Sequence, residues 1–243
     1  MTGFGDAMID CNIRLLEHTI PCRFRFADTA RYFQSDPDGP PPADCSPVTV
    51  HPEAWQELSD AGIELCAHTE YSVLTAFISD ALLPLGCVVF HAVALRWRDR
   101  AWLICAESGV GKSTQARWLR RLRPEEFGVI SGDRPILSFQ ANEITVHPSP
   151  WNGKENWHDA EAAPLGGLIL LERGEENRLF SLTEHEAILS VYPQFLYTAW
   201  DRENVKRVAD METRLLRAGP LWKLTTHEVP ASTKLLLETV FPL

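Results

Sequence analysis

Paired cysteines, long apolar runs and excess positive charge are all absent from this sequence of 243 residues. The six cysteines are scattered and form no C-x-x-C pair, which excludes the usual zinc and dithiol motifs. Three of them, Cys66, Cys87 and Cys105, lie in apolar runs and are expected to be buried. No apolar run approaches the ~20 residues that a membrane-spanning helix needs. A formal net charge of −10 argues against general affinity for nucleic acid or anionic membranes.

A signal peptide and internal repeats are also missing, so we expect a cytoplasmic protein with neither nucleic-acid nor membrane partners. A hydrophobic fraction of 45% is enough for a buried core. The oligomeric state stays open, and a homo-oligomer is one of the alternatives. A local basic patch exists, and we expect it to be the solvated face of a helix. It consists of Arg117, Arg120, Arg121 and Arg123.

The spacing of apolar residues divides the chain into two parts. Residues 1 to about 35 alternate, as in Cys22–Phe26, which is typical of strands with one solvated face. The proline-dense stretch Asp36–Pro42 excludes helix and central strand, and it marks a loop or a seam. Helical spacing follows from Thr69 to Leu83. We expect an N-terminal β-rich element over residues 1–65 and an α/β domain over residues 66–243.

Strands and helices are mixed in the second part. A strand is expected over Cys87–Leu95, and the polar turn after it leads into a second strand over Ala101–Cys105, so that the two form a hairpin. The further strands expected are Phe127–Ile130, the hairpin Ile136–Phe139 with Ile144–His147, the central strand Leu165–Glu172, and Leu221–Thr226. The helices expected are Lys112 to about Arg123, about Thr183–Tyr197, about Glu203–Ala218, and one from about Ser232.

The most informative stretch is Leu103–Thr114, an apolar strand that enters a turn ending in Gly-Lys-Ser-Thr before a helix. This context predicts a phosphate-binding loop whose backbone N–H groups surround nucleotide phosphates. Lys112 would reach the β- and γ-phosphates, and the Ser113 hydroxyl would bind Mg²⁺. The first glycine of the usual pattern is Ala106 here, which is compatible with binding if its φ stays negative. The nucleotide-binding residues expected are Ser108, Gly109, Val110, Gly111, Lys112, Ser113 and Thr114.

Two further candidates lie before and after this loop. Asp133 follows a short apolar strand, where a carboxylate can hold Mg²⁺ or accept a proton from an acceptor hydroxyl. The plain alternative is a turn aspartate. His91 lies within the apolar strand expected to pair with the strand before the loop. It is either a core histidine or a contact to the γ-phosphate or the acceptor.

Lys154 belongs to the loop between Pro148 and Pro164, which is long and aromatic for a plain connection. It could neutralise charge on a transferring phosphoryl group, or it could be an exposed lysine in a loop held by tryptophan packing. In the first case Trp151 or Trp157 could line a substrate or base site.

Arg173 follows the central strand, at the kind of strand end where ligands gather in α/β proteins. Its guanidinium could act like an arginine finger. An ion pair with Glu172 or Glu175 is an equally good interpretation.

Together, His91-Ala92, the loop Glu107–Ser113 and the turn Asp133-Arg134 resemble the HPr kinase/phosphorylase family, whose core is related to PEP carboxykinase. The resemblance covers roughly Gly86–Leu171. It implies a mixed, hairpin-rich α/β core with a P-loop, rather than a doubly wound sheet, and it favours a functional His91.

The sequence departs from this family at Gly132-Asp133, where the family typically carries two adjacent aspartates. Asp133 corresponds to the second of these, because Arg134 follows it. The first is the proton acceptor expected in the family. No match to the family's HPr-docking segment is visible, so HPr itself is not the expected acceptor.

The sequence therefore predicts an ATP- and Mg²⁺-dependent kinase that acts on a hydroxyl of a peptide, a protein or a small molecule. The alternatives are a non-catalytic nucleotide-binding or peptide-carrier module and an ATP hydrolase that drives a conformational change. The catalytic residues predicted are His91, Lys112, Asp133, Lys154 and Arg173, with Ser113 and Asp133 as the metal ligands.

Overall fold

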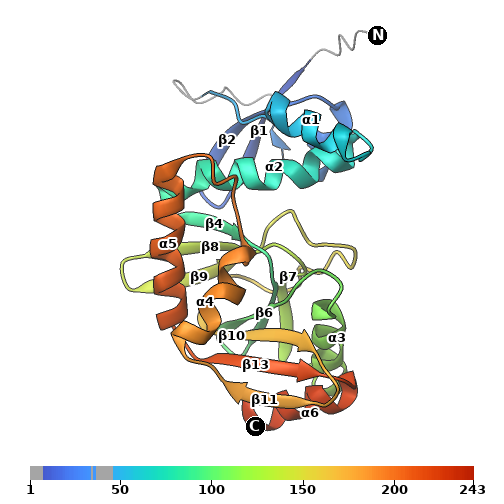
Figure 1. The fold of residues 1–243 in the computed structure, drawn as a ribbon, viewed down its shortest axis with the longest axis vertical. Coiled ribbons are helices and arrows are strands. Elements are labelled where there is room, and N and C mark those ends of the chain that lie inside the picture. The colour runs from blue at the N-terminus through green and yellow to red at the C-terminus, as the bar shows by residue number, and fades with distance from the viewer. Residues whose placement is uncertain (1–7, 34, 37–45) are drawn as a thin grey trace. The chain divides into compact units, whose positions relative to one another are not determined.

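The computed structural model describes residues 8–33, 35–36 and 46–243, and Figure 1 shows its helices and strands. The chain divides into two compact units, residues 1–85 and 86–243. The expected domain boundary between residues 65 and 66 stays a prediction, and the helix that follows it belongs to the first unit. Most of the proline-dense stretch, as well as Cys45, lies outside the described residues. None of the described helices is long and apolar enough to cross a bilayer.

The first unit contains the β-rich element that the alternating residues predict. Its antiparallel sheet has the order β2-β1-β3, with β1 (Ile9–Leu15), β2 (His18–Phe24) and β3 (Ser35–Asp36). Its helical segments are η1 (Ala27–Tyr32), α1 (Pro52–Asp60), α2 (Ala67–Leu82) and η2 (Leu83–Leu85). Glu70 is buried in α2 and accepts hydrogen bonds from the backbone N–H groups of Arg25 and Phe26 and from the Thr29 hydroxyl. These bonds satisfy the buried carboxylate.

The second unit is the mixed, hairpin-rich α/β core that the sequence predicts, built on a sheet of ten strands. Its strands are β4 (Cys87–Phe90), β5 (Val93–Trp97), β6 (Arg100–Cys105), β7 (Phe127–Ser131), β8 (Ile136–Gln140), β9 (Glu143–His147), β10 (Ala163–Arg173), β11 (Arg178–Ser181), β12 (Phe195–Leu196) and β13 (Leu221–Thr226). Its helical segments are α3 (Lys112–Leu122), α4 (Glu184–Val191), η3 (Tyr192–Gln194), α5 (Arg202–Arg217) and α6 (Val229–Thr239). The hairpins β5–β6 and β8–β9 confirm the sequence-based expectation.

The central strand β10 joins the arms of this sheet, because it pairs with three other strands. It is parallel to β6 and to β13, and its first residues are antiparallel to β9. Cys105, the last residue of β6, lies opposite Leu170, and β10 continues to Arg173. The parallel strands β6 and β10 thus end at the same edge, and the loop after β6 begins there.

The strand expected over Cys87–Leu95 is interrupted at His91 and Ala92. Strand β4 pairs with β8 and β12, whereas β5 pairs with β6 and β7, so the chain passes here from one arm of the sheet to the other. An apolar run cannot distinguish one continuous buried strand from two short ones. His91 therefore lies at a crossing point, and not inside the strand that pairs with β6.

The C-terminal helices confirm the predicted order with shifted bounds. Helix α4 begins directly after Thr183, whose side chain forms a reciprocal capping box with Glu186. The helix ends at Val191, and η3 begins at the next residue. The expected helix was longer because the apolar spacing continues past Pro193. Cys87 and Cys105 are buried as expected, whereas Cys66 is only half-buried. The elements that the sequence did not predict include α1, β11, β12 and the short segments η1, η2 and η3, of which η1 lies where alternation predicted strand.

Candidate active site

The P-loop connects β6 to α3, as its sequence context predicts. Gly109 and Gly111 have positive φ values of 80° and 123°, a conformation that favours glycine. Ala106 is buried, and its φ is not positive. The replacement of the first glycine by alanine is therefore compatible with the backbone of this loop.

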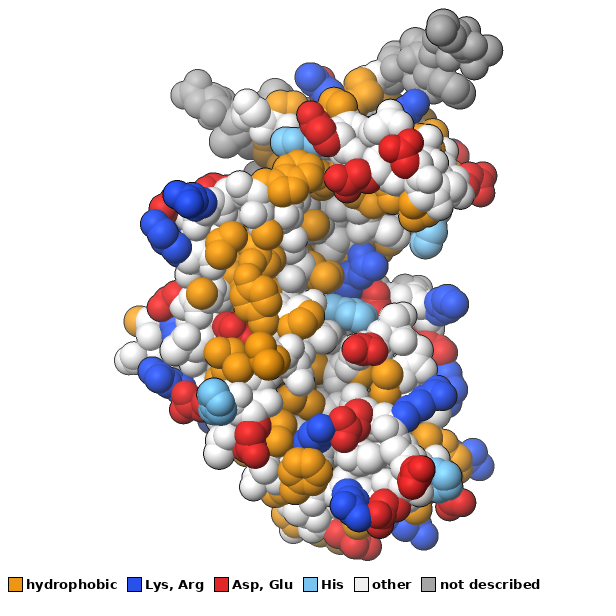
Figure 2. Space-filling model, in the orientation of Figure 1, with side chains coloured by type: hydrophobic (Ala, Val, Ile, Leu, Met, Phe, Trp, Pro, Cys, Tyr) orange, Lys and Arg blue, Asp and Glu red, His pale blue; other side chains and the backbone are white. Residues whose placement is uncertain are grey.

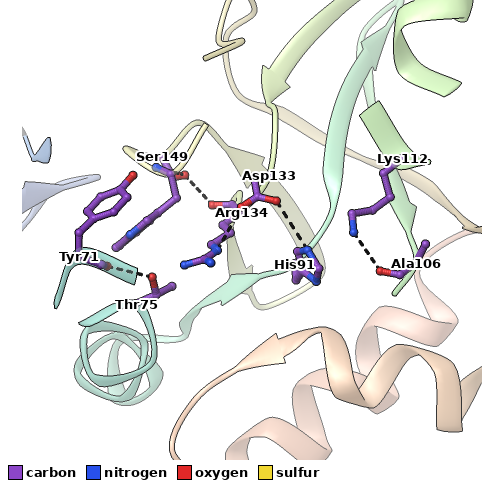
Figure 3. A network of polar contacts seen from close by, with 9 residues as sticks. Tyr71, Thr75, His91, Ala106, Lys112, Asp133, Arg134 and Ser149 are labelled. Atoms are coloured by element: carbon purple, nitrogen blue, oxygen red, sulfur yellow. Dashed lines mark hydrogen bonds and ion pairs between the residues drawn. The ribbon is translucent and has the colours of Figure 1, made fainter. Parts of the chain in front are cut away.

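Lys112 opens helix α3 and is buried at the base of the loop. Its Nζ donates a hydrogen bond to the carbonyl oxygen of Ala106 at 3.0 Å (Figure 3). Burial lowers the pKa of this ammonium, while the negative charge of Asp133 and the Cys105 thiol act in the opposite direction. Asp133 is therefore close enough to Lys112 for their charges to interact.

His91 and Asp133 face each other across the crossing between β4 and β5. The distance from His91 Nε2 to Asp133 Oδ1 is 3.6 Å, and the other carboxylate oxygen lies 3.2 Å from Arg134 Nε. The backbone holds the pair together, because Ala92 N donates to the Asp133 carbonyl oxygen at 3.0 Å. Figure 3 shows the His91 ring between Asp133 and Lys112.

The imidazole of His91 has a lowered pKa, mainly because it is buried. The positive charges of Lys112 and Arg134 lower it further, whereas Asp133 and the Gln194 side chain raise it. A lowered pKa keeps His91 neutral at neutral pH, so the ring can accept a hydrogen bond.

Gly132 occupies a position with no room for a side chain. A Cβ atom built there would overlap the carbonyl oxygen of Asn152. The aspartate that the HPr kinase family carries at this position is therefore excluded by the loop after β9, unless that loop moves. The sequence shows that the aspartate is missing. It does not predict the contact between Gly132 and Asn152, because no motif links the two segments.

The loop after β9 is attached to the turn at Asp133 by backbone and hydroxyl contacts. Arg134 N donates to the Trp151 carbonyl at 3.1 Å, and the Ser149 hydroxyl donates to the Arg134 carbonyl at 2.5 Å (Figure 3). The side chain of Trp151 is only 1% exposed, so it packs in the core and cannot line an open base site. Gly153 packs against Asp133, because a Cβ built on this glycine would lie 3.0 Å from that of Asp133.

The same loop is also tied to helix α3 through the predicted basic patch. Arg117 pairs with Glu155 at 2.6 Å and Arg120 pairs with Asp159 at 2.5 Å. Both guanidinium groups lie over the ring of Trp157, within 6 Å of its centroid. Two arginines of the patch therefore hold the loop in place, which the expectation of a solvated face did not include.

Lys154 and Arg173 differ in their contacts with the site. Lys154 is exposed and directly follows Gly153, which packs against Asp133. Arg173, at the end of β10, donates hydrogen bonds to the P-loop carbonyls of Gly109 (3.0 Å) and Val110 (3.3 Å). Because the C=O and N–H groups of a trans peptide point in opposite directions, fixing these carbonyls also fixes the direction of the N–H groups that follow them.

The available oxygen donors fit Mg²⁺ shared with a nucleotide. Ser113 offers a half-buried hydroxyl in the first turn of α3, and Asp133 offers a partly exposed carboxylate. Within the described residues, no three His, Cys, Asp or Glu side chains form a cluster that could hold a metal. Mg²⁺ is commonly bound by one or two protein oxygens plus phosphate oxygens, so this sparse donor set suits it.

Similarity to known proteins is found among solved structures. No protein-family model matches the chain, and no curated protein matches its sequence. Among solved structures, the chain is similar to the Hpr(Ser) kinase/phosphatase from Coxiella burnetii, with 15% sequence identity and a TM-score of 0.38. The match covers 63% of this chain and 95% of that chain.

Proposed function

We propose that this protein is an ATP- and Mg²⁺-dependent kinase that transfers the γ-phosphoryl group to a hydroxyl of a peptide, a protein or a small molecule. One observation carries the proposal: the P-loop lysine, His91 and Asp133 meet in one place although they come from three separate segments. A P-loop alone indicates phosphate binding. An imidazole and a carboxylate beside its lysine add groups that an acceptor hydroxyl can approach.

Each residue then has a defined role in the transfer. The P-loop N–H groups and Lys112 stabilise negative charge on the phosphates, and the exposed Lys154 can approach the same charge from the loop after β9. Ser113 and Asp133 hold Mg²⁺, which when bound there neutralises charge on the phosphate oxygens. The acceptor oxygen bonds to the γ-phosphorus while the bond to the bridging oxygen breaks and ADP leaves. The hydroxyl proton passes to the neutral imidazole of His91, which lies beside Asp133.

A second candidate function is a nucleotide-binding module without catalysis. The observation that favours it is the lack of space for a side chain at Gly132. The aspartate expected there as proton acceptor, from the family resemblance, cannot be accommodated. Such a module would bind ATP through the same P-loop residues. It would transfer no phosphoryl group.

Incubation of the purified protein with γ-labelled ATP, Mg²⁺ and a pool of serine- and threonine-containing peptides tests the proposal. We expect labelled peptide with the wild type and with Lys206→Ala, an exposed-lysine control on α5, and none with Lys112→Ala. Equal and background-level labelling by all three proteins would reject the kinase. Tight ATP binding without turnover would then select the binding module, and free phosphate without labelled peptide would select a hydrolase.

A further inference from the structure

A pocket of about 660 Å³ opens beside the P-loop, where β6 and β10 end. Its inner wall includes Ala106, Glu107 and Val110 of the loop, together with Arg173. Its opposite wall comes from α4 and η3. Two other pockets are lined by none of the predicted site residues. A ligand in the pocket beside the P-loop would therefore lie next to bound phosphates.

Gln194 connects this pocket to the catalytic residues. Its backbone carbonyl accepts a hydrogen bond from His91 N at 2.7 Å. The side chain lines the pocket, is only 6% exposed, and donates from Nε2 to the Ser190 carbonyl oxygen at 3.3 Å. The pocket wall and the backbone at His91 are therefore joined through one residue.

The outer wall of the pocket is apolar and unusually exposed. Leu189 of α4 lines the pocket and is 85% exposed, and Phe180 of β11 lines it from the side of the sheet. Ile188 and Tyr192 extend the exposed apolar surface beyond the pocket. Figure 2 shows hydrophobic side chains gathered on this face, over the position of α4 in Figure 1. An exposed apolar surface beside a pocket is typical of a binding site.

The charges in the pocket favour a ligand without acidic groups. Three carboxylates line it, from Glu107, Glu172 and Glu186, against two cations. Lys223 pairs with Glu172 at 2.7 Å. This pairing leaves Glu107 and Glu186 against the single guanidinium of Arg173, so the lining keeps a net negative charge. Like charges across an interface are costly, so acidic side chains on the ligand would be rejected.

We infer that this pocket is the acceptor site and that it takes a peptide whose serine or threonine is flanked by aliphatic or aromatic residues and not by acidic ones. A peptide fits better than a compact small molecule, because the apolar surface continues out of the pocket along α4. The peptide's apolar side chain packs on Leu189 and Phe180, which line the pocket and are exposed. This inference rests on the proposed kinase function and names its substrate class.

Two fluorescein-labelled peptides, Ala-Leu-Ser-Leu-Ala and Ala-Glu-Ser-Glu-Ala, test the inference by fluorescence polarisation with a non-hydrolysable ATP analogue and Mg²⁺ present. We expect the wild type to bind the leucine peptide at least about tenfold more tightly. Leu189→Lys should remove this preference, whereas Leu243→Lys should keep it, since Leu243 is an exposed leucine that does not line the pocket. Both substitutions are at exposed positions, which avoids loss of folding.

The outcomes distinguish a failure of the pocket proposal from a failure of the kinase proposal. A leucine preference that depends on Leu189, without transfer of phosphate from ATP, supports the pocket and rejects the kinase. Transfer to both peptides at equal rates keeps the kinase and overturns the pocket. Equal or absent binding of the two peptides also overturns it. So does a loss of affinity for a fluorescent ATP analogue in Leu189→Lys, because the pocket would then hold the nucleoside.

Discussion

The two loops that border the candidate site are held in different ways. The P-loop takes its shape from its own glycines and from two cationic side chains, Lys112 and Arg173, that bind its carbonyl oxygens. The loop after β9 is held from outside, by the turn at Arg134 and by two arginines of α3. In the proposed kinase, the first loop would bind phosphate through its backbone. The second loop determines which side chains fit beside Asp133, and in the proposed kinase it would therefore affect phosphoryl transfer.

The two loops also differ in how they accept a departure from the family pattern. The alanine in the P-loop is accommodated without a positive φ. At Gly132, by contrast, the Asn152 carbonyl fills the space of a side chain. In the proposed kinase, nucleotide binding would thus depend on local sequence, whereas phosphoryl transfer would depend on a contact between distant segments.

The largest effect is expected from Lys112→Ala. Loss of the ammonium should lower phosphoryl transfer about 100-fold or more, because this group stabilises the charge that develops on the transferring phosphoryl group. Initial rates with γ-labelled ATP measure the effect. A rate within a factor of about two of the wild type would show that the P-loop lysine takes no part in the reaction.

Gly132→Ala and Gly109→Ala compare the two loops directly. At Gly132 the added methyl group meets the Asn152 carbonyl, and we expect a loss of about 1–3 kcal/mol of unfolding free energy. At Gly109 nothing lies within 4 Å of an added Cβ, and the cost of about 1–2 kcal/mol comes from its positive φ alone.

Unfolding by urea and nucleotide titration separate these two effects. Gly109→Ala should weaken ATP binding, because the P-loop amides are displaced, whereas Gly132→Ala should leave ATP binding close to that of the wild type. A Gly132→Ala protein as stable as the wild type would show that the loop after β9 moves at little cost to make room for the added methyl group.

Arg173→Ala distinguishes a positioning residue from an arginine finger. Its two hydrogen bonds to the P-loop predict about a tenfold rise in the dissociation constant for ATP, with little change in kcat. The matched control is Arg178→Ala, an exposed arginine on β11. A fall in kcat of about 1000-fold at unchanged ATP affinity would instead assign Arg173 to the transferring phosphoryl group.

The smallest effect is expected at Glu212 of α5, which belongs to neither of the two loops compared above. Burial raises the pKa of its carboxyl from 4.5 to about 7, and Oε1 has no hydrogen-bond partner among the described residues. The neutral form therefore stabilises the fold fully below pH 4.5, and this stabilisation is lost as pH rises through about 7. Glu212→Gln should raise the Tm at pH 8 and leave it nearly unchanged at pH 4. An equal shift at both pH values would contradict this.

The sequence predicted those features that depend on residues close together in the chain. The strand, loop and helix around Lys112 and the hairpins β5–β6 and β8–β9 follow from apolar spacing and turn residues, and the structure confirms them. The resemblance also named His91 and Asp133, which the structure brings together. It could not show that β4 ends before His91, because β4 and the first three residues of β5 are apolar on both sides of it.

The features that the sequence did not predict depend on contacts between distant segments. The Asn152 carbonyl against Gly132, the Arg173 hydrogen bonds to the P-loop and the position of Gln194 beside His91 join residues far apart in the chain. None of the three has a sequence motif, because each depends on how the tertiary fold brings separate loops and strand ends together. Gln194 in particular lies in the three-residue segment η3, which is too short for a periodic pattern.

A crystal structure with a non-hydrolysable ATP analogue and Mg²⁺ tests the central claim most directly. The account predicts the triphosphate within the loop Glu107–Ser113, with Lys112 Nζ on the γ-phosphate. It also predicts Mg²⁺ about 2.1 Å from the Ser113 hydroxyl and on the side of the Asp133 carboxylate. A triphosphate bound away from this loop, or a γ-phosphate remote from His91 and Asp133, would contradict it.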